Sequence, residues 1–240
     1  MVYSYYSIKE KGETMKPIAH IYTDFKTKFG LPRQSGLIEE ITGKIIFEKE
    51  YSIAEAFKGL EDFSHIWLLW EFSQAKKEGW KPTVRPPLLG GNRRMGVFAT
   101  RSPFRPNSIG LSCVKLEKIE NNKTFGTVLY VSGCDMMNGT PIYDIKPYLS
   151  YCDSKPEAKG GFTENLDERK LEVSISDELL VRVPEEKHSE LLGVLRGDPR
   201  PSYQDDPQRA YGFEFADFEI GFKVQDKTLT VIKVERLKRN

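Results

Sequence analysis

Residues 85–110 limit what this chain can fold into, because they include four prolines and four glycines. Proline fixes φ and lacks a backbone N–H, and glycine lets the backbone turn sharply, so no long helix can run through this segment. The segment also carries five arginines: Arg85, Arg93, Arg94, Arg101 and Arg105. A guanidinium is always charged and offers a planar fork of donors to phosphate or carboxylate. The pattern predicts a rigid loop that binds an anion; the alternative is a solvated loop with surface charge.

The residues on both sides of this loop favour β-strands. Short apolar segments predict strands at residues 18–22, 44–47, 96–100, 111–119 and 124–132. The run HIWLLWEF at residues 65–72 is almost continuously apolar and predicts a strand buried on both faces. One helix is expected from Ser52 to about Leu60, because Ser52 and Glu55 match a capping box. Many short strands with a single helix indicate a β-barrel.

A polar segment follows the predicted barrel. Residues 154–167 are rich in Lys, Glu and Gly, which is typical of a linker or long loop. A helix is predicted over residues 184–195, ending near Gly197. Further strands are predicted at residues 170–176, 213–224 and 228–234. We therefore expect a mainly β protein with an N-terminal β-barrel domain, residues 15–152, and a small C-terminal α+β domain, residues 153–240.

Charge, cysteine and histidine content exclude several functions. The net charge is only +1, so affinity for nucleic acid has to come from a local patch. No apolar run approaches the roughly 18 residues of a membrane span, and the N-terminus lacks the apolar core of a signal peptide. The three cysteines form no CxxC pair and the three histidines lack ligand spacing, so we expect no metal site and no disulfide framework. A reducing cytoplasm is the expected location.

Four further segments combine turn residues with polar side chains. They are residues 28–36, 132–141, 144–148 and 198–203. Asp135 lies in the second of them, a tight turn at the end of a predicted strand. Asx-turns and surface ion pairs are the alternative interpretation of each segment. The chain has no Gly-rich strand–turn–helix of the Rossmann type and no Walker A loop, so an adenine cofactor has to be held in another way.

Three long, mutually spaced motifs carry a family resemblance. They read DFKTKFGLPRQSGL from Asp24, PTVRPPLLGGNRRMGVFATRSPFRPNSIGLS from Pro82 and GTPIYDIKPYLSYCDS from Gly139. In these motifs the chain resembles the TrmO (YaeB) family, densely over residues 18–153 and onward through DPRPSY, with a weaker match to the end. The resemblance implies a β-barrel tRNA methyltransferase that uses S-adenosylmethionine. Its implied target is N6 of N6-threonylcarbamoyladenosine, the nucleotide 3′ to the anticodon.

The resemblance also implies which residues bind the cofactor. They are Arg33, Gln34, Ser35, Phe72, Ser73, Arg101, Leu111, Ser132, Gly133, Cys134 and Asp135. Two positions depart from the family pattern: Ser73 stands where relatives often carry His or Asp, and Asn138 replaces an acid common in a DGTP motif. The resemblance further implies a homodimer with the cofactor site near the subunit interface.

The chemistry of methyl transfer suggests roles for two of these residues. A sulfonium cofactor needs an aromatic ring or a carboxylate near its positive centre, which Phe72 or Asp135 would supply. Asp135 is also the candidate catalytic residue, because the urea-like target N–H is acidic and a nearby carboxylate could accept its proton. Loss of that proton to water is the alternative.

The anticodon loop of tRNA is the expected partner of the arginine-rich loop. Arg85, Arg93, Arg94 and Arg105 are predicted to bind RNA through its phosphates, and at least one arginine to pair with the threonyl carboxylate. Two other functions stay open at this point: a non-catalytic RNA-binding β-barrel, and a methyltransferase that acts on another substrate.

Overall fold

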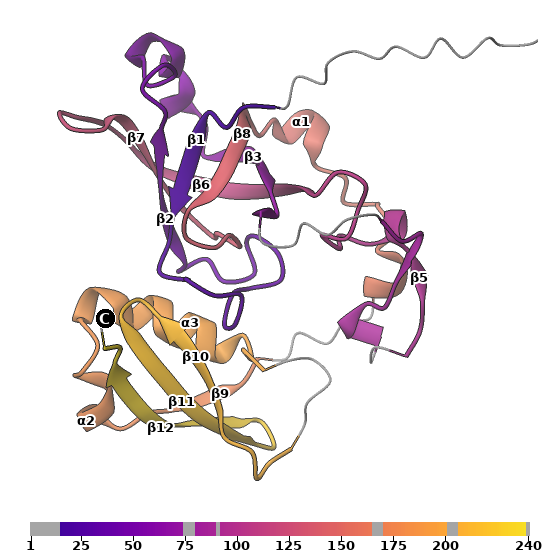
Figure 1. The fold of residues 1–240 in the computed structure, drawn as a ribbon, viewed down its shortest axis with the longest axis vertical. Coiled ribbons are helices and arrows are strands. Elements are labelled where there is room, and N and C mark those ends of the chain that lie inside the picture. The colour runs from indigo at the N-terminus through magenta and orange to yellow at the C-terminus, as the bar shows by residue number, and fades with distance from the viewer. Residues whose placement is uncertain (1–14, 74–79, 90–91, 165–169, 201–205, 239–240) are drawn as a thin grey trace, which may run out of the picture.

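A six-stranded barrel forms the N-terminal part of the molecule (Figure 1). The computed structural model describes residues 15–73, 80–89, 92–164, 170–200 and 206–238. The barrel is closed and antiparallel, in the order β1-β2-β7-β6-β3-β8. Its strands are β1 (Ala19–Tyr22), β2 (Thr42–Phe47), β3 (His65–Glu71), β6 (Ile109–Asn122), β7 (Gly126–Ser132) and β8 (Thr140–Pro147). The expected N-terminal β-barrel is confirmed.

Alternation of side chains along the strands explains why the sheet can close around a core. Along β3, Ile66, Leu68 and Trp70 are buried, and the residues between them are only partly buried. A barrel with a single wall buries every second residue inside. The expectation that residues 65–72 are buried on both faces is therefore wrong, because the outer side chains, such as that of Trp67, are only partly covered.

The helix expected at Ser52 takes another form. The chain makes two short 3-10 turns there, η1 (Ala54–Phe57) and η2 (Leu60–Asp62). The Ser52 hydroxyl does not cap a helix, because its oxygen accepts a hydrogen bond from the backbone N–H of Thr127 at 2.8 Å. A contact with a barrel strand thus overrides the local capping signal.

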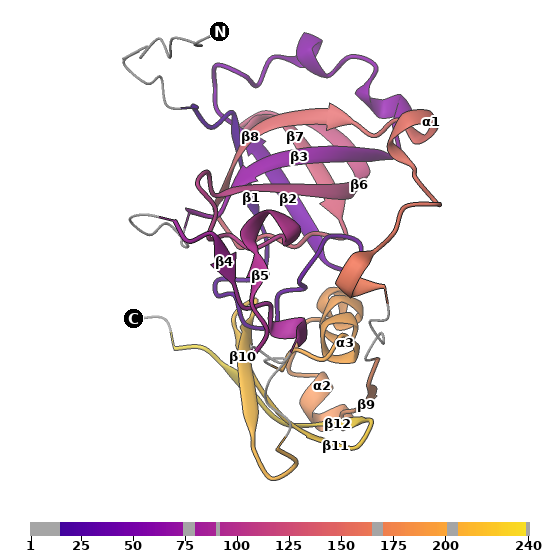
Figure 2. The same cartoon turned by 90° about the vertical axis from the view of Figure 1, so that its right-hand side faces the viewer.

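The arginine-rich loop leaves the barrel and forms a small hairpin of its own. Its elements are β4 (Thr83–Val84), η4 (Pro87–Leu89), β5 (Met95–Gly96) and η5 (Val97–Ala99). The strand expected at residues 96–100 is wrong beyond Gly96, because the chain turns at Val97, whose N–H donates to the carbonyl oxygen of Pro82 at 2.9 Å. Figures 1 and 2 show this hairpin beside the barrel and outside its wall.

The C-terminal part is a four-stranded sheet accompanied by short helices, which confirms the expected small α+β region. The strands, in the order β10-β11-β12-β9, are β9 (Glu172–Ser174), β10 (Tyr211–Phe215), β11 (Phe218–Gln225) and β12 (Thr228–Arg236). The helical segments from residue 150 onward are α1 (Ser150–Asp153), η6 (Gly161–Thr163), α2 (Asp177–Leu180), η7 (Glu185–Lys187) and α3 (His188–Arg196). The strand expected at residues 213–224 is two strands, because the chain turns at Ala216 with a φ of 51°. The expected helix at residues 184–195 is present as η7 and α3, and Gly197 caps it.

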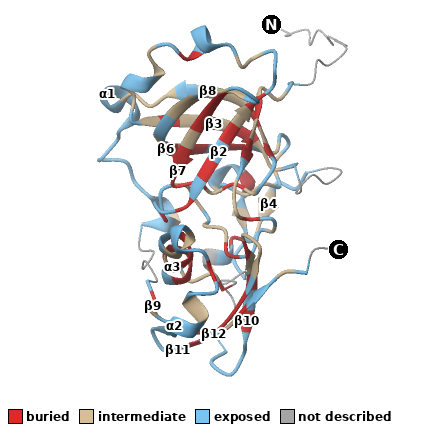
Figure 3. Ribbon diagram, turned by 90° about the vertical axis from the view of Figure 1, so that its left-hand side faces the viewer, coloured by how far each residue is buried: buried red, intermediate tan, exposed pale blue. Residues whose placement is uncertain are grey.

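The connection between β1 and β2, residues 23–41, joins the two parts. The rings of Phe25 and Phe215 meet edge-on with centroids 5.7 Å apart, and the N–H of Ala216 donates to the carbonyl oxygen of Asp24 at 2.9 Å. Buried residues run along the barrel strands and reappear on α3 and β10 (Figure 3). The connection is therefore fixed by the barrel on one side and by the C-terminal sheet on the other.

Candidate functional site

Three segments that are far apart in the sequence meet at one end of the barrel: the connection between β1 and β2, strand β6, and the turn after β7. Ser35 Oγ accepts a hydrogen bond from the backbone N–H of Cys113 at 3.1 Å. The N–H of Gly36 donates to the carbonyl oxygen of Gly133 at 2.9 Å. The structure therefore brings two of the predicted cofactor segments together.

Asp135 is held by a chain of hydrogen bonds that starts inside the barrel. The indole N–H of Trp70 donates to Ser112 Oγ at 2.9 Å, and the Ser112 hydroxyl donates to Asp135 Oδ1 at 2.6 Å. An indole can only donate, so the Ser112 hydroxyl has to direct its own proton at Asp135. Gly110 makes room for the indole, because a Cβ there would lie 2.3 Å from the ring of Trp70. Ser112 and Trp70 are both buried, which fixes this geometry.

Burial raises the pKa of Asp135 above its ordinary value. The hydrogen bond from Ser112, the backbone N–H groups of Asp135 and Ser35, and the charge of Arg101 oppose this rise but are smaller than the effect of burial. The carboxylate is therefore more basic than that of an exposed aspartate. Such a group suits either acceptance of a proton or pairing with a bound cation.

Arg101 links the arginine-rich loop to the connection between β1 and β2. One of its terminal nitrogens donates to Gln34 Oε1, although the two residues are 67 positions apart in the sequence. The side-chain amide of Gln34 in turn donates to the carbonyl oxygen of Arg33. We call Gln34, Ser35, Arg101 and Asp135 the mouth cluster, since these four predicted residues, from three separate loops, come together here.

Three other predicted cofactor residues lie just after β3 or on β6, the strand that carries Ser112. Phe72 is half-buried against Trp70, with ring centroids 4.2 Å apart. Leu111 follows a buried position and precedes another on β6, and its own side chain is 54% exposed. Ser73 is exposed. Phe72 and Leu111 thus supply accessible apolar surface near the mouth cluster.

Two predicted side chains, at the end of β7 and in the turn that follows, are engaged elsewhere. The Ser132 hydroxyl donates to Glu117 Oε1 at 2.6 Å. Cys134 is fully buried, its backbone N–H donates to the carbonyl oxygen of Ile41 at 3.3 Å, and burial raises the pKa of its thiol. This turn therefore contributes its backbone and the carboxylate of Asp135 to the site.

Residues 80–109, which we call the basic arm, carry six cationic residues and no Asp or Glu. The six are Lys81, Arg85, Arg93, Arg94, Arg101 and Arg105. Arg94 donates to Thr83 Oγ1 at 2.9 Å, and Arg105 donates to the carbonyl oxygen of Thr100 at 2.7 Å. Among the described residues, none of the six forms an ion pair with an acid. Apart from Arg101, whose charge acts on Asp135, their positive charge is thus not neutralised by that part of the chain.

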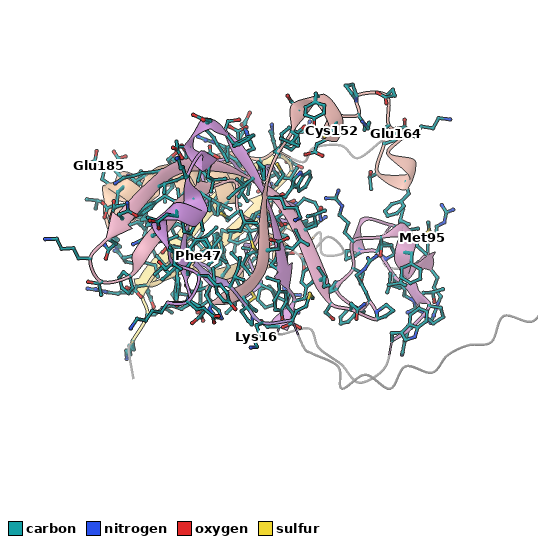
Figure 4. All side chains as sticks on the ribbon, turned by 90° about the horizontal axis from the view of Figure 1, so that it is seen from above. Lys16, Phe47, Met95, Cys152, Glu164 and Glu185 are labelled. Carbon is teal, nitrogen blue, oxygen red and sulfur yellow. The ribbon has the colours of Figure 1, made fainter. Side chains whose placement is uncertain are left out.

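The predicted RNA-binding arginines differ in how they are held. Arg85 and Arg93 are exposed, whereas Arg94 and Arg105 also hold the arm in shape through the hydrogen bonds just described. Seen from above in Figure 4, the hairpin marked by Met95 lies to one side of the barrel marked by Phe47. The arm therefore presents its charge outside the barrel wall.

The remaining polar segments hold ion pairs. Asp144 pairs with Lys146 at 2.9 Å on β8. Asp198 and Arg200 form two contacts of 2.8 Å between largely buried side chains, and residues 201–203 of that segment lie outside the described residues. Within the described ranges, no group of three or more His, Cys, Asp and Glu could hold a metal ion. No helix in those ranges is long and apolar enough to span a bilayer.

Trp70 and Ser112 are functional candidates that sequence reasoning missed. A tryptophan at an inward position of an apolar strand needs an acceptor for its N–H, so the sequence did hold a signal for Trp70. Which residue accepts depends on the register of β3 against β6, which pairs Trp70 with Gly110 and Leu68 with Ser112. That register could not be read from either strand alone.

Known proteins resemble this chain over most of its length. The model of the tRNA-methyltransferase O N-terminal domain matches residues 20–154, and that of the TrmO C-terminal domain matches residues 168–237. The chain is 39% identical over 226 residues to the tRNA (adenine(37)-N6)-methyltransferase of Escherichia coli (strain K12), covering 91% of this chain and 96% of that one. It is 46% identical over 164 residues to the enzyme of the same name from Eikenella corrodens, covering 68% and 92%.

A solved structure agrees with both parts of the fold. The crystal structure of TrmO from Pseudomonas aeruginosa superposes with a TM-score of 0.76 at 31% sequence identity, covering 95% of this chain and 99% of that one. The two family models together span the barrel and the C-terminal sheet. This chain therefore belongs to the tRNA-methyltransferase O (TrmO) family.

Proposed function

We propose that this protein methylates N6 of N6-threonylcarbamoyladenosine, the modified adenosine 3′ to the anticodon of its tRNA substrate. As a member of the TrmO family it is a tRNA methyltransferase that uses S-adenosylmethionine, and the threonylcarbamoyl group on the target is what the proposal adds. The observation that carries the proposal is the mouth cluster beside the basic arm. The carboxylate of Asp135 lies near the cations of the basic arm. Those cations suit a substrate that carries phosphates and a carboxylate of its own.

The donor set of the mouth cluster fits this cofactor. S-adenosylmethionine supplies, when bound, an electrophilic methyl group on a positively charged sulfur. The carboxylate of Asp135 and the ring of Phe72 would offset that charge. The side chains of Gln34 and Arg101 would hold the polar ends, and Leu111 the apolar surface. The other residues proposed for the cofactor site are Arg33, Ser35, Ser73, Ser132, Gly133 and Cys134.

Asp135 is proposed to accept the proton of the target N–H. That nitrogen belongs to a urea-like group, so its N–H is more acidic than that of an ordinary amine. Burial makes the Asp135 carboxylate more basic, and Ser112 orients it. A positioned base contributes typically about 10²–10⁴-fold to a rate, and alignment of the two reactants supplies much of the rest.

The basic arm is proposed to bind the RNA. Arg85, Arg93 and Arg94 would contact phosphates of the anticodon loop, with Arg105 supporting the shape of the arm. One arginine of the arm would pair with the threonyl carboxylate, because a guanidinium matches a carboxylate through two parallel hydrogen bonds. The uncompensated charge of the arm supports this role.

The proposal extends to assembly and location. We propose a catalytic barrel domain over residues 15–152 and a C-terminal domain over 153–240 that contacts tRNA or the partner subunit. Leu37, on the connection that carries Ser35, is 58% exposed, and this apolar side chain supports a homodimer that covers it by a two-fold contact. Three free cysteines support a cytoplasmic location.

Mass analysis of tRNA nucleosides tests the proposed substrate. Cells that lack the protein should accumulate N6-threonylcarbamoyladenosine without its methyl group, and restoring the protein should restore the methylated form. Purified protein should methylate tRNA that carries the threonylcarbamoyl group and leave tRNA with unmodified adenosine unchanged. Equal methylation of both tRNAs would contradict the proposed substrate, and methylation of neither would leave a non-catalytic RNA binder as the better description.

A further inference from the structure

Two large aromatic side chains of the basic arm face solvent next to each other. Phe98 is 70% exposed and Trp80 is 49% exposed. Their ring centroids are 6.0 Å apart and their planes are inclined by 33°, so the rings are closer to parallel than to edge-on. An exposed cluster of large apolar side chains usually marks a surface that binds something.

Phe98 is held in its exposed position by the residues around it. Val97 on one side is buried, and Thr100 Oγ1 donates to the Val97 carbonyl oxygen at 2.8 Å. The guanidinium carbon of Arg105 lies 5.8 Å from the centroid of the Phe98 ring, and Arg105 also donates to the carbonyl oxygen of Thr100 at 2.7 Å. The ring is thus pre-organised outward by its own segment.

The charge around these rings indicates the kind of partner. Residues 80–109 hold six cations and no acid. A two-fold contact with a second copy through this surface would set these cations against the same six, which is unfavourable. Aromatic rings and guanidinium groups beside a basic surface are the combination that stacks on unpaired bases and neutralises the neighbouring phosphates.

We infer that Trp80 and Phe98 form a stacking surface for unpaired bases of RNA, with Arg105 fixing Phe98 and the exposed arginines contacting the flanking phosphates. This inference rests on the proposed function and adds to it. The inference identifies the unpaired loop bases of the tRNA, and not its paired stem, as the part that the basic arm binds. Base stacking holds the loop open beside the mouth cluster.

Binding of a short hairpin RNA with an unpaired loop tests the stacking surface. Fluorescence anisotropy should show Phe98→Ala and Phe98→Leu binding the hairpin roughly 5- to 100-fold more weakly than the parent, because leucine keeps apolar area but has no π-face. Phe98→Tyr should bind like the parent. Phe125→Ala is the matched control, since Phe125 is 50% exposed on the β6–β7 hairpin, outside the basic arm, and its loss should change nothing. Parental affinity in Phe98→Leu would overturn the inference.

Two further measurements separate stacking from charge and from self-association. Affinity of Phe98→Ala should keep the parental dependence on salt, because no phosphate contact is lost. A fluorescent 2-aminopurine in the loop should change its emission on binding the parent and not on binding Phe98→Ala. If sedimentation shows that Phe98→Ala changes the oligomeric state without RNA, the surface is a subunit contact and the inference is wrong.

The same experiments distinguish this inference from the proposed function. Methylation of tRNA by the parent, together with normal hairpin binding by Phe98→Ala, would overturn the stacking surface and leave the enzyme activity standing. A parent that neither binds the hairpin nor methylates tRNA would overturn both. Calorimetric titration with S-adenosylmethionine should give the parental affinity in Phe98→Ala, since Phe98 is proposed to contact RNA only.

Discussion

Ser112 is the residue that gives Asp135 its orientation. It lies inward on β6 between a group that can only donate, the Trp70 indole, and a group that accepts, the Asp135 carboxylate. The sequence predicted that these strands exist and that Asp135 ends one of them in a turn. It did not predict the hydrogen bond between Ser112 and Asp135. The contacts between Trp70 and Ser112 and between Gln34 and Arg101 join segments whose relative placement is determined only when the barrel closes.

Replacing Asp135 by Asn keeps the size of the side chain and removes its basicity. We expect Asp135→Asn to bind tRNA almost as the parent does and the cationic cofactor more weakly. At saturating cofactor it should still lose methyl transfer by roughly 10²–10⁴-fold, because the target proton has lost its acceptor. Single-turnover methylation at saturating cofactor and tRNA measures this. A near-parental rate at saturation would exclude Asp135 as the base and leave it only the pairing with the sulfonium charge.

Removing the Ser112 hydroxyl should shift the pH dependence of the reaction. The hydrogen bond from Ser112 favours the charged form of Asp135, so in Ser112→Ala the pKa of Asp135 rises further above its ordinary value. A base works only when deprotonated, and the acid limb of the single-turnover pH profile should therefore move to higher pH. Ser112→Cys, which keeps a weak donor, should shift it less. An unchanged profile in a folded Ser112→Ala protein would contradict this role.

At the scale of elements, the strands in which apolar and polar residues alternate regularly could be predicted from the sequence. β8 was missed because TPIYDIKP includes two prolines and a charged pair, which locally favour a turn. In the barrel this segment becomes a strand because β1 and β3 pair with it on its two sides. The capping signal at Ser52 predicted a helix wrongly for the same kind of reason, since the backbone N–H of Thr127 on β7 donates to its hydroxyl oxygen.

The basic arm should determine how RNA binding responds to salt. Arg85 and Arg93 are exposed, so replacing them with glutamine removes charge with little cost to the fold. Each lost phosphate contact should reduce the slope of log affinity against log salt concentration by about one unit. Titrations of tRNA over a range of salt measure the slope. Lys123→Gln is a matched control, because it removes one exposed charge from the β6–β7 turn and should leave the slope unchanged. A parental slope in Arg85→Gln/Arg93→Gln would show that these two arginines do not contact phosphates.

At the scale of the whole molecule, the contact between the barrel and α3 contains a buried acid that the sequence did not reveal. Glu190 is 3% exposed, and its Oε1 has no hydrogen-bond partner among the described residues. Its other oxygen accepts from Thr42 Oγ1 at 3.4 Å and from Lys187 Nζ at 3.3 Å. Burial raises the pKa of Glu190 to about 7; Asp24 adds to the rise, whereas Lys187 and Thr42 oppose it.

This acid should make the stability of the fold depend on pH. The folded protein keeps the Glu190 proton to higher pH than the unfolded chain, so the free energy of unfolding falls as pH rises from about 4.5 to about 7 and stays lowered above that. We expect Glu190→Gln to be more stable than the parent at pH values near 8, by up to about 3 kcal/mol, and equal to it near pH 4. Denaturant unfolding at both pH values measures the difference. A gain of the same size at both would mean that ionisation is not its cause.

The packing of the β1–β2 connection against the C-terminal sheet determines whether the barrel and the C-terminal part can be separated. Gly30 has a φ of 80°, and a Cβ there would lie 2.4 Å from the Phe213 ring, so the backbone packs directly against that ring. The same connection carries Gln34 to the mouth cluster a few residues later. A barrel separated from residues 153–240 would uncover Phe25 and lose the support of the turn that holds Gln34. The two parts are therefore not interchangeable modules. A foreign domain fused to this barrel would need a surface that packs against Gly30, as Phe213 does, before the site could form.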